Sequence, residues 1–211
     1  MRIAVVGATG ATGRLFIQRA LAGGHHLTAL VRSPDKLPMY AHLTVIQGNV
    51  LNPEHVDSVM NGQDAVFCAL GTGKSTTKTT IRADGTRQTV AALARRDQNP
   101  HLVILSSLGV GESRAQMRWP VRWMIPWMLR HPLADHARQE QVARRSELPC
   151  TFLRPTALTD APSSGSPLHV SYPPERIQAQ PGVSRVDVAA FALSVIESRT
   201  RLNEALTLTT A

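Results

Sequence analysis

The stretch RIAVVGATGATGRLF at residues 2–16 decides the fold. It starts as a β-branched run, passes through Gly7, Gly10 and Gly13, and then follows a helical pattern. A buried strand, a tight glycine turn and a helix N-terminus together form a site for a dinucleotide pyrophosphate. The glycines let the main chain approach the phosphates, and the free N–H groups of the helix attract the anion. The spacing is GxxGxxG, a variant of GxGxxG. The alternative is an ordinary strand-to-helix turn, which the position of the motif between strand and helix makes the poorer interpretation.

Apolar, β-rich runs alternate with helical patterns over most of the chain. We expect strands at 2–6, 26–31, 43–47, 64–70, 101–106 and 150–154, with 204–209 as a further candidate. We expect helices at 13–23, 53–61, 79–97, 134–147 and 186–198. Several strands are continuously hydrophobic, as is usual where both faces of a sheet are covered. The alternation predicts an α/β fold: a single Rossmann-type domain over residues 1–211, with a doubly wound parallel sheet.

Two stretches, 108–132 and 155–184, break this alternation. Both follow late strands, so we expect them at the carboxyl ends of the strands, where open α/β sheets bind ligands. They are therefore the predicted substrate region. The first carries tryptophans and methionines at roughly helical offsets, which are Trp119, Trp123, Met124, Trp127 and Met128. Such a pattern most often indicates core or interface packing. An aromatic cap over a planar substrate, and a dimer or membrane-surface patch, are the alternatives.

Composition limits the classes of function. The chain has 211 residues, 43% of them hydrophobic, with no apolar run of membrane-spanning length and no secretory signal pattern. Cys68 and Cys150 lie in predicted strands without metal-type spacing, which predicts buried thiols, no metal site and a cytoplasmic location. The net charge is +8, but the arginines that supply most of it are scattered. We therefore expect no specific nucleic-acid partner, and a monomer or homodimer.

Arg32 ends the second predicted strand, about twenty residues after the glycine turn. In an NAD-binding protein, a ribose-binding carboxylate stands at this place. Lys36 follows four residues later, and Arg14 lies just after the glycines. A guanidinium binds a 2′-phosphate in bidentate fashion, whereas a carboxylate repels it. The sequence therefore favours NADP(H) over NAD(H), the alternative being that Arg32 is a solvated strand-end arginine.

Two later strand ends also carry candidate cofactor contacts. Asn49 follows the third predicted strand, where a polar side chain can hydrogen-bond an adenine edge and Val50 can lie against the ring. Leu70, Gly71 and Thr72 follow the fourth, and bring exposed backbone to the phosphates or the nicotinamide ribose. Each segment alone could be a simple loop. Their placement at successive strand ends favours one cofactor site.

The ordered set of motifs resembles the atypical short-chain dehydrogenase/reductases of the NmrA-like and NADH-flavin-reductase-like group, and within it the biliverdin-IXβ (NADPH flavin) reductase type. The stretches that carry the resemblance are GATGATG (7–13), LVRSPDKL (30–37), QGNVLN (47–52), GQDAVFCALGT (62–72), TTIRADGTRQTVAAL (79–93), VILSSLG (103–109), DHARQEQVARRSELPCTFLRP (135–155) and RVDVAAFAL (185–193). Together they cover nearly the whole chain apart from 110–132 and 160–184.

This resemblance implies a Rossmann fold that binds NADP(H). The residues implied at the glycine turn are Gly7, Thr9, Gly10, Ala11, Thr12 and Gly13. Those implied elsewhere are Arg32 and Lys36 at the 2′-phosphate, Ser106 and Ser107 beside the nicotinamide, and Pro155 and Thr156 bordering the same ring. The chain departs from the family pattern in having Asn49 instead of an aspartate, and Thr156 instead of the histidine of the biliverdin reductases. The tryptophan segment has no clear counterpart there.

The sequence also restricts the chemistry. Alcohol dehydrogenation of the usual short-chain type needs a tyrosine and a lysine four residues apart. Thr44 and Arg176 stand four residues after the only tyrosines, Tyr40 and Tyr172. Hydride transfer to a flavin or quinone-like ring needs chiefly that two ring systems are held together, and Ser107 could orient the acceptor or relay a proton. The alternative is that the two serines merely cap the strand.

His136 is a third catalytic candidate, because it stands four residues before Glu140 on a predicted helix. The pair could form a polar wall of the substrate site or a proton relay. The alternative is a solvated helix face that Asp135 caps at its N-terminus. We therefore expect an NADPH-dependent oxidoreductase that transfers hydride to a flavin, a quinone or a similar planar acceptor. A non-catalytic NADP(H)-binding redox sensor or regulator of the NmrA-like type is the alternative.

Overall fold

The computed structural model describes residues 1–73, 75, 77–96, 99–177 and 182–210. Its strands are β1 (Arg2–Val6), β2 (His26–Val31), β3 (Leu43–Gln47), β4 (Ala65–Cys68), β5 (His101–Leu105), β6 (Cys150–Pro155), β7 (Leu158–Thr159), β8 (His169–Ser171), β9 (Val183–Ser184) and β10 (Ala205–Thr209). Its helices are α1 (Ala11–Ala22), α2 (Pro53–Met60), α3 (Ile81–Leu93), α4 (Val121–Met128), α5 (Arg130–Arg144) and α6 (Arg185–Ser198), with 3₁₀ turns η1 (Pro34–Lys36) and η2 (Gly111–Gln116).

The main sheet has eight strands in the order β3-β2-β1-β4-β5-β6-β10-β8, and β7 pairs with β9 in a small second sheet. Seven strands of the main sheet run parallel, and only β8 is antiparallel, to β10. From β1 the chain adds β2 and β3 on one side, and then crosses over to add β4 on the other side of β1. Because the parallel strands all end at one edge, which we call the carboxyl edge, the loops that follow them meet there.

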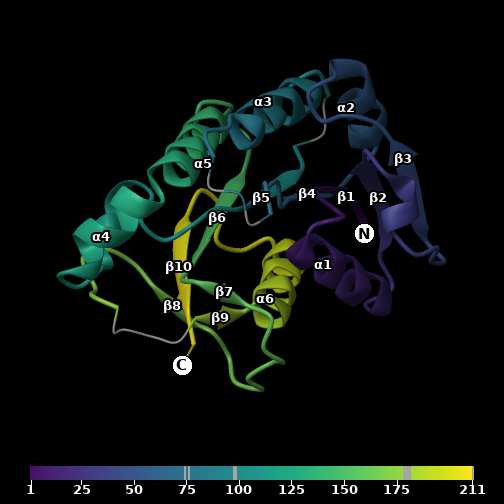
Figure 1. The fold of residues 1–211 in the computed structure, drawn as a ribbon. Helices are drawn as coiled ribbons and strands as arrows, with labels where there is room; N and C mark the ends of the chain where they lie inside the picture. The colour runs from purple at the N-terminus through teal and green to yellow at the C-terminus, as the bar shows by residue number, and fades with distance from the viewer. Residues whose placement is uncertain (74, 76, 97–98, 178–181, 211) are drawn as a thin grey trace.

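Helices cover both faces of this sheet (Figure 1). Helices α1 and α6 pack together on one face, whereas α2, α3 and α5 form the layer on the other. Alternate residues of β1 enter different cores: Ile3 and Val5 face α1 and α6, and Ala4 and Val6 belong to the core under α2 and α3. Burial on both faces explains why the inner strands read as continuous apolar runs.

The Rossmann-type doubly wound sheet is confirmed. All seven predicted strands and all five predicted helices form, with ends shifted by a few residues. The predicted helix 79–97 ends at Leu93, and its last predicted residue lies outside the described part of the chain. The helix predicted at 134–147 begins earlier, at Arg130. Both cysteines are free and buried, and no helix in the described residues is long and apolar enough to cross a membrane.

The two segments that break the alternation contain more regular structure than expected. The first forms η2, α4 and the start of α5, and the second forms β7, β8 and β9, with residues 178–181 outside the described part. Buried Gln116 of η2 donates to Ser171 of β8 and accepts from Thr207 of β10. Part of each segment therefore extends the sheet or packs against it.

Candidate cofactor site

The glycine turn after β1 has a backbone that only glycine fits. Gly7 has φ +86°, and a Cβ there would lie 2.4 Å from the Ala69 carbonyl oxygen. A Cβ on Gly13 would lie 2.3 Å from the carbonyl oxygen of Gly7. The turn is closed by a hydrogen bond of 3.1 Å from the Gly10 N–H to the Gly7 carbonyl. These close approaches hold α1 against β1 and β4, and leave the inside of the turn as bare main chain.

Helix α1 starts at this turn without a cap. Gly10 is its N-cap residue, no side chain bonds to its first turn, and that turn has no acidic residue. The first-turn N–H groups of Ala11, Thr12 and Gly13 therefore keep their donor capacity and the positive end of the helix dipole. Arg14 donates from Nε to the Thr9 carbonyl at 3.0 Å, which holds the loop without adding a carboxylate. This arrangement fits a pyrophosphate.

Arg32 and Lys36 lie at the end of β2, beside the glycine turn. Both side chains are exposed, and neither has a hydrogen bond or ion pair with any residue that the structure describes. Arg32 follows the last residue of the strand, and Lys36 ends η1. The carboxyl end of β2 therefore offers two uncommitted cations, at the place where the sequence predicted a 2′-phosphate site.

The loops after β3 and β4 are held in place by their own hydrogen bonds and packing. The Asn49 Oδ1 accepts from the Leu51 N–H at 3.0 Å, which holds the side chain, while its amide NH₂ keeps its capacity to donate to an adenine edge. Val50 is buried in the core. A Cβ on Gly85 of α3 would lie 2.6 Å from Leu70 Cδ1 and 3.0 Å from Val50 Cγ2. Val50 and Leu70 are thus chiefly packing residues that place their loops against α3.

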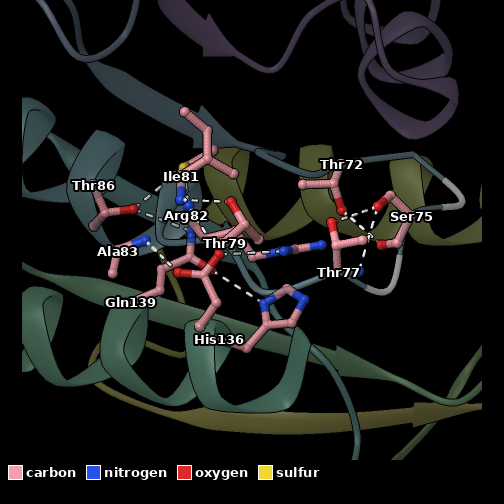
Figure 2. Close-up of polar contacts among 12 residues, drawn as sticks. Thr72, Ser75, Thr77, Thr79, Ile81, Arg82, Ala83, Thr86, His136 and Gln139 are labelled. Atoms are coloured by element: carbon pink, nitrogen blue, oxygen red, sulfur yellow. Dashed lines mark hydrogen bonds and ion pairs between the residues drawn. The ribbon is translucent and has the colours of Figure 1, made fainter. Parts of the chain in front are cut away.

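The loop after β4 continues through residues 71–72, where it approaches a buried cation. A Cβ on Gly71 would lie 3.8 Å from an Nη of Arg82, and the Thr72 hydroxyl donates to the Ser75 carbonyl at 2.9 Å (Figure 2). Arg82 sits in the first turn of α3, is buried, and leaves its Nε without a partner in the described chain. Arg82 could not be recognised from the sequence, because nothing in the pattern around it distinguishes it from a solvated helix arginine.

A buried charge network lies behind the end of β5. The Ser106 hydroxyl donates to Glu140 Oε1 at 2.6 Å, and Arg154 of β6 donates to both oxygens of Glu140, at 2.9 and 2.6 Å. Arg154 also donates to Glu112 at 2.7 Å. Burial disfavours the charge on Arg154, but Glu140 and Glu112 more than offset that penalty and raise the pKa of the guanidinium. This network holds the Ser106 side chain in place. It could not be predicted from a local sequence pattern, because its members come from different elements.

The other residues predicted beside the nicotinamide lie at the same edge. Ser107 is half-buried and its hydroxyl donates to the Leu108 carbonyl at 3.1 Å, so it is held less firmly than Ser106. Pro155 ends β6, and the Thr156 N–H donates to the Leu208 carbonyl. The Thr156 hydroxyl is buried and has no partner in the described chain. A buried hydroxyl without a hydrogen-bond partner is unusual, and a polar substituent on a bound ring would supply that partner.

His136 faces the layer between α5 and α3 (Figure 2). Its Nδ1 lies 3.2 Å from Gln139 Oε1, and the Gln139 amide donates to Thr86 of α3 at 3.1 Å. Because Gln139 Oε1 can only accept, Nδ1 carries the hydrogen and Nε2 is the free acceptor. Burial, and then the charge of Arg82, lower the pKa of His136 to about 3. At neutral pH the ring can therefore orient a group by hydrogen bonding, but it carries no acidic proton to relay.

The alternative for this helix, a solvated face capped by Asp135, is wrong. Asp135 lies inside α5, fully buried, and accepts from the Arg82 and Ala83 N–H groups at 3.2 and 3.1 Å. It therefore caps α3, the neighbouring helix, and also pairs with the Arg82 guanidinium at 3.3 Å. Glu140 is buried as well. A cap donated by another helix cannot be recognised from local sequence.

A groove of about 470 Å³ lies beside the network, between α5 and the loop before η2. Its lining includes Glu112, Arg138, Glu140, Arg144, Arg145 and Arg154. Neither tyrosine lies near it or near the serines. Tyr172 bonds Glu204 at the start of β10, and Tyr40 precedes β3, so both lie toward the amino ends of strands.

Comparison with known proteins places this geometry in a family context. A family model described as NAD(P)H-binding matches residues 7–199. The photosystem II assembly factor Ycf39 of Synechocystis is 37% identical over 84 residues, which is 39% of this chain and 26% of that protein. The oxidoreductase stcQ of Emericella nidulans is 28% identical over 216 residues, which covers 92% of this chain and 77% of that protein. The match thus spans about a quarter of the first relative and about three quarters of the second.

Solved structures share the whole fold. ChuY of Escherichia coli O157:H7, described as an anaerobilin reductase, superposes with a TM-score of 0.80 at 18% identity, over 99% of this chain and 97% of that one. A short-chain dehydrogenase/reductase of Veillonella parvula in complex with NADP has a TM-score of 0.80 at 17% identity, over 99% and 94%. At these identities the likeness concerns the fold.

Proposed function

The chain belongs to the NAD(P)H-binding family, and on that premise we propose that it is an NADPH-dependent oxidoreductase that delivers hydride to a flavin, a quinone or a similar planar acceptor. The observation that carries the choice of cofactor is the exposed, unpaired couple of Arg32 and Lys36 at the end of β2. Two cations near this strand end, with Arg32 at the place where an NAD-binding protein has its carboxylate, favour a ribose that bears a 2′-phosphate.

Different residues would bind the different parts of the nucleotide and the acceptor. The bare main chain of Gly7 and the uncapped start of α1 receive the pyrophosphate. Ser106, locked by Glu140, forms a rigid floor at the end of β5, and Ser107 and the unpartnered Thr156 hydroxyl are the groups left to orient a ring. When bound, the reduced nicotinamide supplies the hydride.

Two features support a planar acceptor over an alcohol. Both tyrosines lie away from the carboxyl edge, and His136 is neutral and bonded to Gln139. Hydride transfer between stacked rings depends on positioning more than on a strong protein acid, and solvent can supply the proton. Among the similar proteins, stcQ is described as an oxidoreductase, and ChuY, which is described as an anaerobilin reductase, shares the fold.

The test is anaerobic steady-state oxidation of NADPH with FMN, FAD and a series of quinones. We expect turnover with at least one acceptor, and a preference for NADPH over NADH. The double variant Arg32→Ala/Lys36→Ala should raise the KM for NADPH by tenfold or more, that is by at least about 1.4 kcal/mol of binding, while leaving the KM for NADH nearly unchanged. Arg19→Ala/Arg95→Ala, which removes two exposed cations elsewhere, is the matched control.

The outcomes separate the two parts of the proposal. An equal rise in the KM for NADPH and for NADH in Arg32→Ala/Lys36→Ala would contradict the assignment of these residues to a 2′-phosphate site. Tight NADPH binding without turnover on any acceptor would contradict the reductase and favour the alternative function, a nucleotide-binding redox regulator. Absence of nucleotide binding in the folded protein would contradict both.

A further inference from the structure

Helix α4 presents its apolar side chains to solvent. Trp123 and Trp127 are 63% and 71% exposed, and lie one helical turn apart on the same face. Met124 and Met128, exposed by 51% and 57%, form the adjoining row. The opposite side, with Ile125, is the half-buried one. The prediction for these residues was core or interface packing, and their exposure excludes the core. An exposed apolar face of this kind is typical of an interaction surface.

The position of α4 argues against a cap over the acceptor. Figure 1 shows α4 at one end of the molecule, beyond α5 and far from α1 and its glycine turn. The tryptophan before the helix, Trp119, is also 81% exposed. We call the surface formed by Trp119, Trp123, Met124, Trp127 and Met128 the tryptophan face.

Arginines surround the tryptophan face. The segment from Ser113 to Ala134 contains four arginines, at positions 114, 118, 122 and 130, and no acidic residue. Arg114 stacks over the Trp123 ring, with 5.1 Å between the guanidinium carbon and the ring centroid. Within the described part of the chain, none of the four forms an ion pair. The face therefore has an apolar centre and an uncompensated positive rim.

This charge distribution decides between occupants. In a two-fold dimer through the tryptophan face, each copy would bring the same four arginines against those of its partner, with no carboxylate in this segment to neutralise them. An anionic phospholipid surface satisfies both parts at once. Tryptophan and methionine enter the boundary between head groups and acyl chains, and the arginines meet phosphates. We propose that α4 is a docking helix for an anionic membrane surface, on which the protein lies without spanning the bilayer.

The chain carries its own probe for this proposal, because its only three tryptophans are Trp119, Trp123 and Trp127. The experiment mixes the full-length protein with vesicles of phosphatidylcholine alone, or of phosphatidylcholine with phosphatidylglycerol, and measures co-sedimentation and tryptophan emission. We expect a blue shift and sedimentation with the anionic vesicles, and a marked loss of both when the salt concentration rises.

Two variants test the two halves of the face. Trp123→Ser/Trp127→Ser should lower partitioning by roughly tenfold or more, because it removes the side chains that insert. Arg118→Gln/Arg122→Gln should weaken binding by a similar factor and flatten its salt dependence. Met39→Ser removes a fully exposed hydrophobic side chain elsewhere, and Arg19→Gln/Arg145→Gln removes the same charge outside the face; both should bind as the parent does. An unchanged NADPH affinity and thermal midpoint show that the variants are folded.

Three outcomes would overturn the proposal. The first is that the folded protein does not bind anionic vesicles at low salt. The second is equal binding to both kinds of vesicle. The third is a dimer in light scattering that Trp123→Ser/Trp127→Ser dissociates, with tryptophan emission already blue-shifted in the absence of lipid, because that result assigns the face to a second copy of the chain.

Discussion

At the residue scale, the glycine turn offers a graded test of how closely main chain and nucleotide must approach. A Cβ on Gly13 would lie 2.3 Å from the Gly7 carbonyl oxygen, whereas a Cβ on Gly10 would lie 3.2 Å from the same oxygen. We expect Gly13→Ala to force α1 away from β1, to destabilise the fold by about 1–3 kcal/mol and to abolish nucleotide binding. Gly10→Ala should need a shift of only a few tenths of an ångström.

The measurement is urea denaturation together with NADPH titration for both variants. The turn assignment predicts a large difference between them in stability, and a larger one in affinity. If Gly13→Ala bound NADPH as the parent protein does, the turn would not be the pyrophosphate site. The Gly10→Ala variant controls for a general effect of side chains in this loop.

Single residues differ in how far sequence could predict their roles. Gly7 and Arg32 follow from spacing, because a strand, a turn and a helix fix where the turn and the next strand end must lie. The state of His136 does not follow, since its low pKa depends on burial between two helices and on Arg82, which is distant in sequence. The unpartnered hydroxyl of Thr156 is likewise a consequence of tertiary packing.

At the element scale, α5 connects α3 and β6, two elements that border the candidate cofactor site. Asp135 caps α3, Gln139 bonds Thr86 of α3, and Glu140 pairs with Arg154 of β6. A single helix thus positions another helix, α3, and a strand, β6, through buried polar groups. The helical spacing of His136 and Glu140 was recognisable in the sequence. The partners of Glu140, Ser106 and Arg154, were not, because they come from other elements.

The Glu140–Arg154 pair yields a stability prediction. Glu140→Leu leaves Arg154 buried with only Glu112, whose side chain is 56% exposed, and we expect a loss of about 3–5 kcal/mol in the free energy of unfolding. Glu140→Leu/Arg154→Met removes both charges and should lose much less, since no uncompensated ion remains. A urea-denaturation double-mutant cycle measures the coupling. Equal losses in the single and double variants would mean that packing, and not the charge pair, explains the effect.

Elements outside the repeated strand–helix pattern were the least predictable. Helix α4 was not predicted, because Pro120 stands directly before it and Pro126 lies inside it. Its apolar face is exposed, and periodicity alone could not decide between core and interface packing. Strand β8 has three residues and pairs antiparallel with β10 at the end of the sheet. A strand this short is defined by its partner, because three residues cannot display a period.

At the scale of the whole molecule, buried histidines make stability depend on pH. His101 of β5 is buried, bonds Thr151 through Nε2 at 2.8 Å and leaves Nδ1 without a partner in the described chain. Burial, and then the charge of Arg199, lower the pKa of His101 to about 4, as burial and Arg82 lower that of His136 to about 3. Both pKa values lie below the unfolded value of about 6.5.

The sign of the effect follows from which state binds the proton. Between pH 6.5 and 4 the unfolded chain protonates these histidines and the folded one does not, so the free energy of unfolding should fall as the pH falls through this window. Each group contributes a slope of up to about 1.4 kcal/mol per pH unit, and above pH 7 neither contributes. The carboxyls with lowered pKa values, Asp84, Glu112 and Asp187, begin to lose their contributions only as the pH falls toward the unfolded values of about 4 to 4.5, which leaves the upper part of the window, above about pH 5.5, to the histidines. Urea denaturation at half-unit pH steps should show a shallower slope for His136→Gln and for His101→Gln, and an unchanged one for the exposed His26→Gln. A parent slope of zero across the window would mean that both rings take up their protons in the folded protein as they do in the unfolded chain, and the neutral state assigned to His136 would then be wrong.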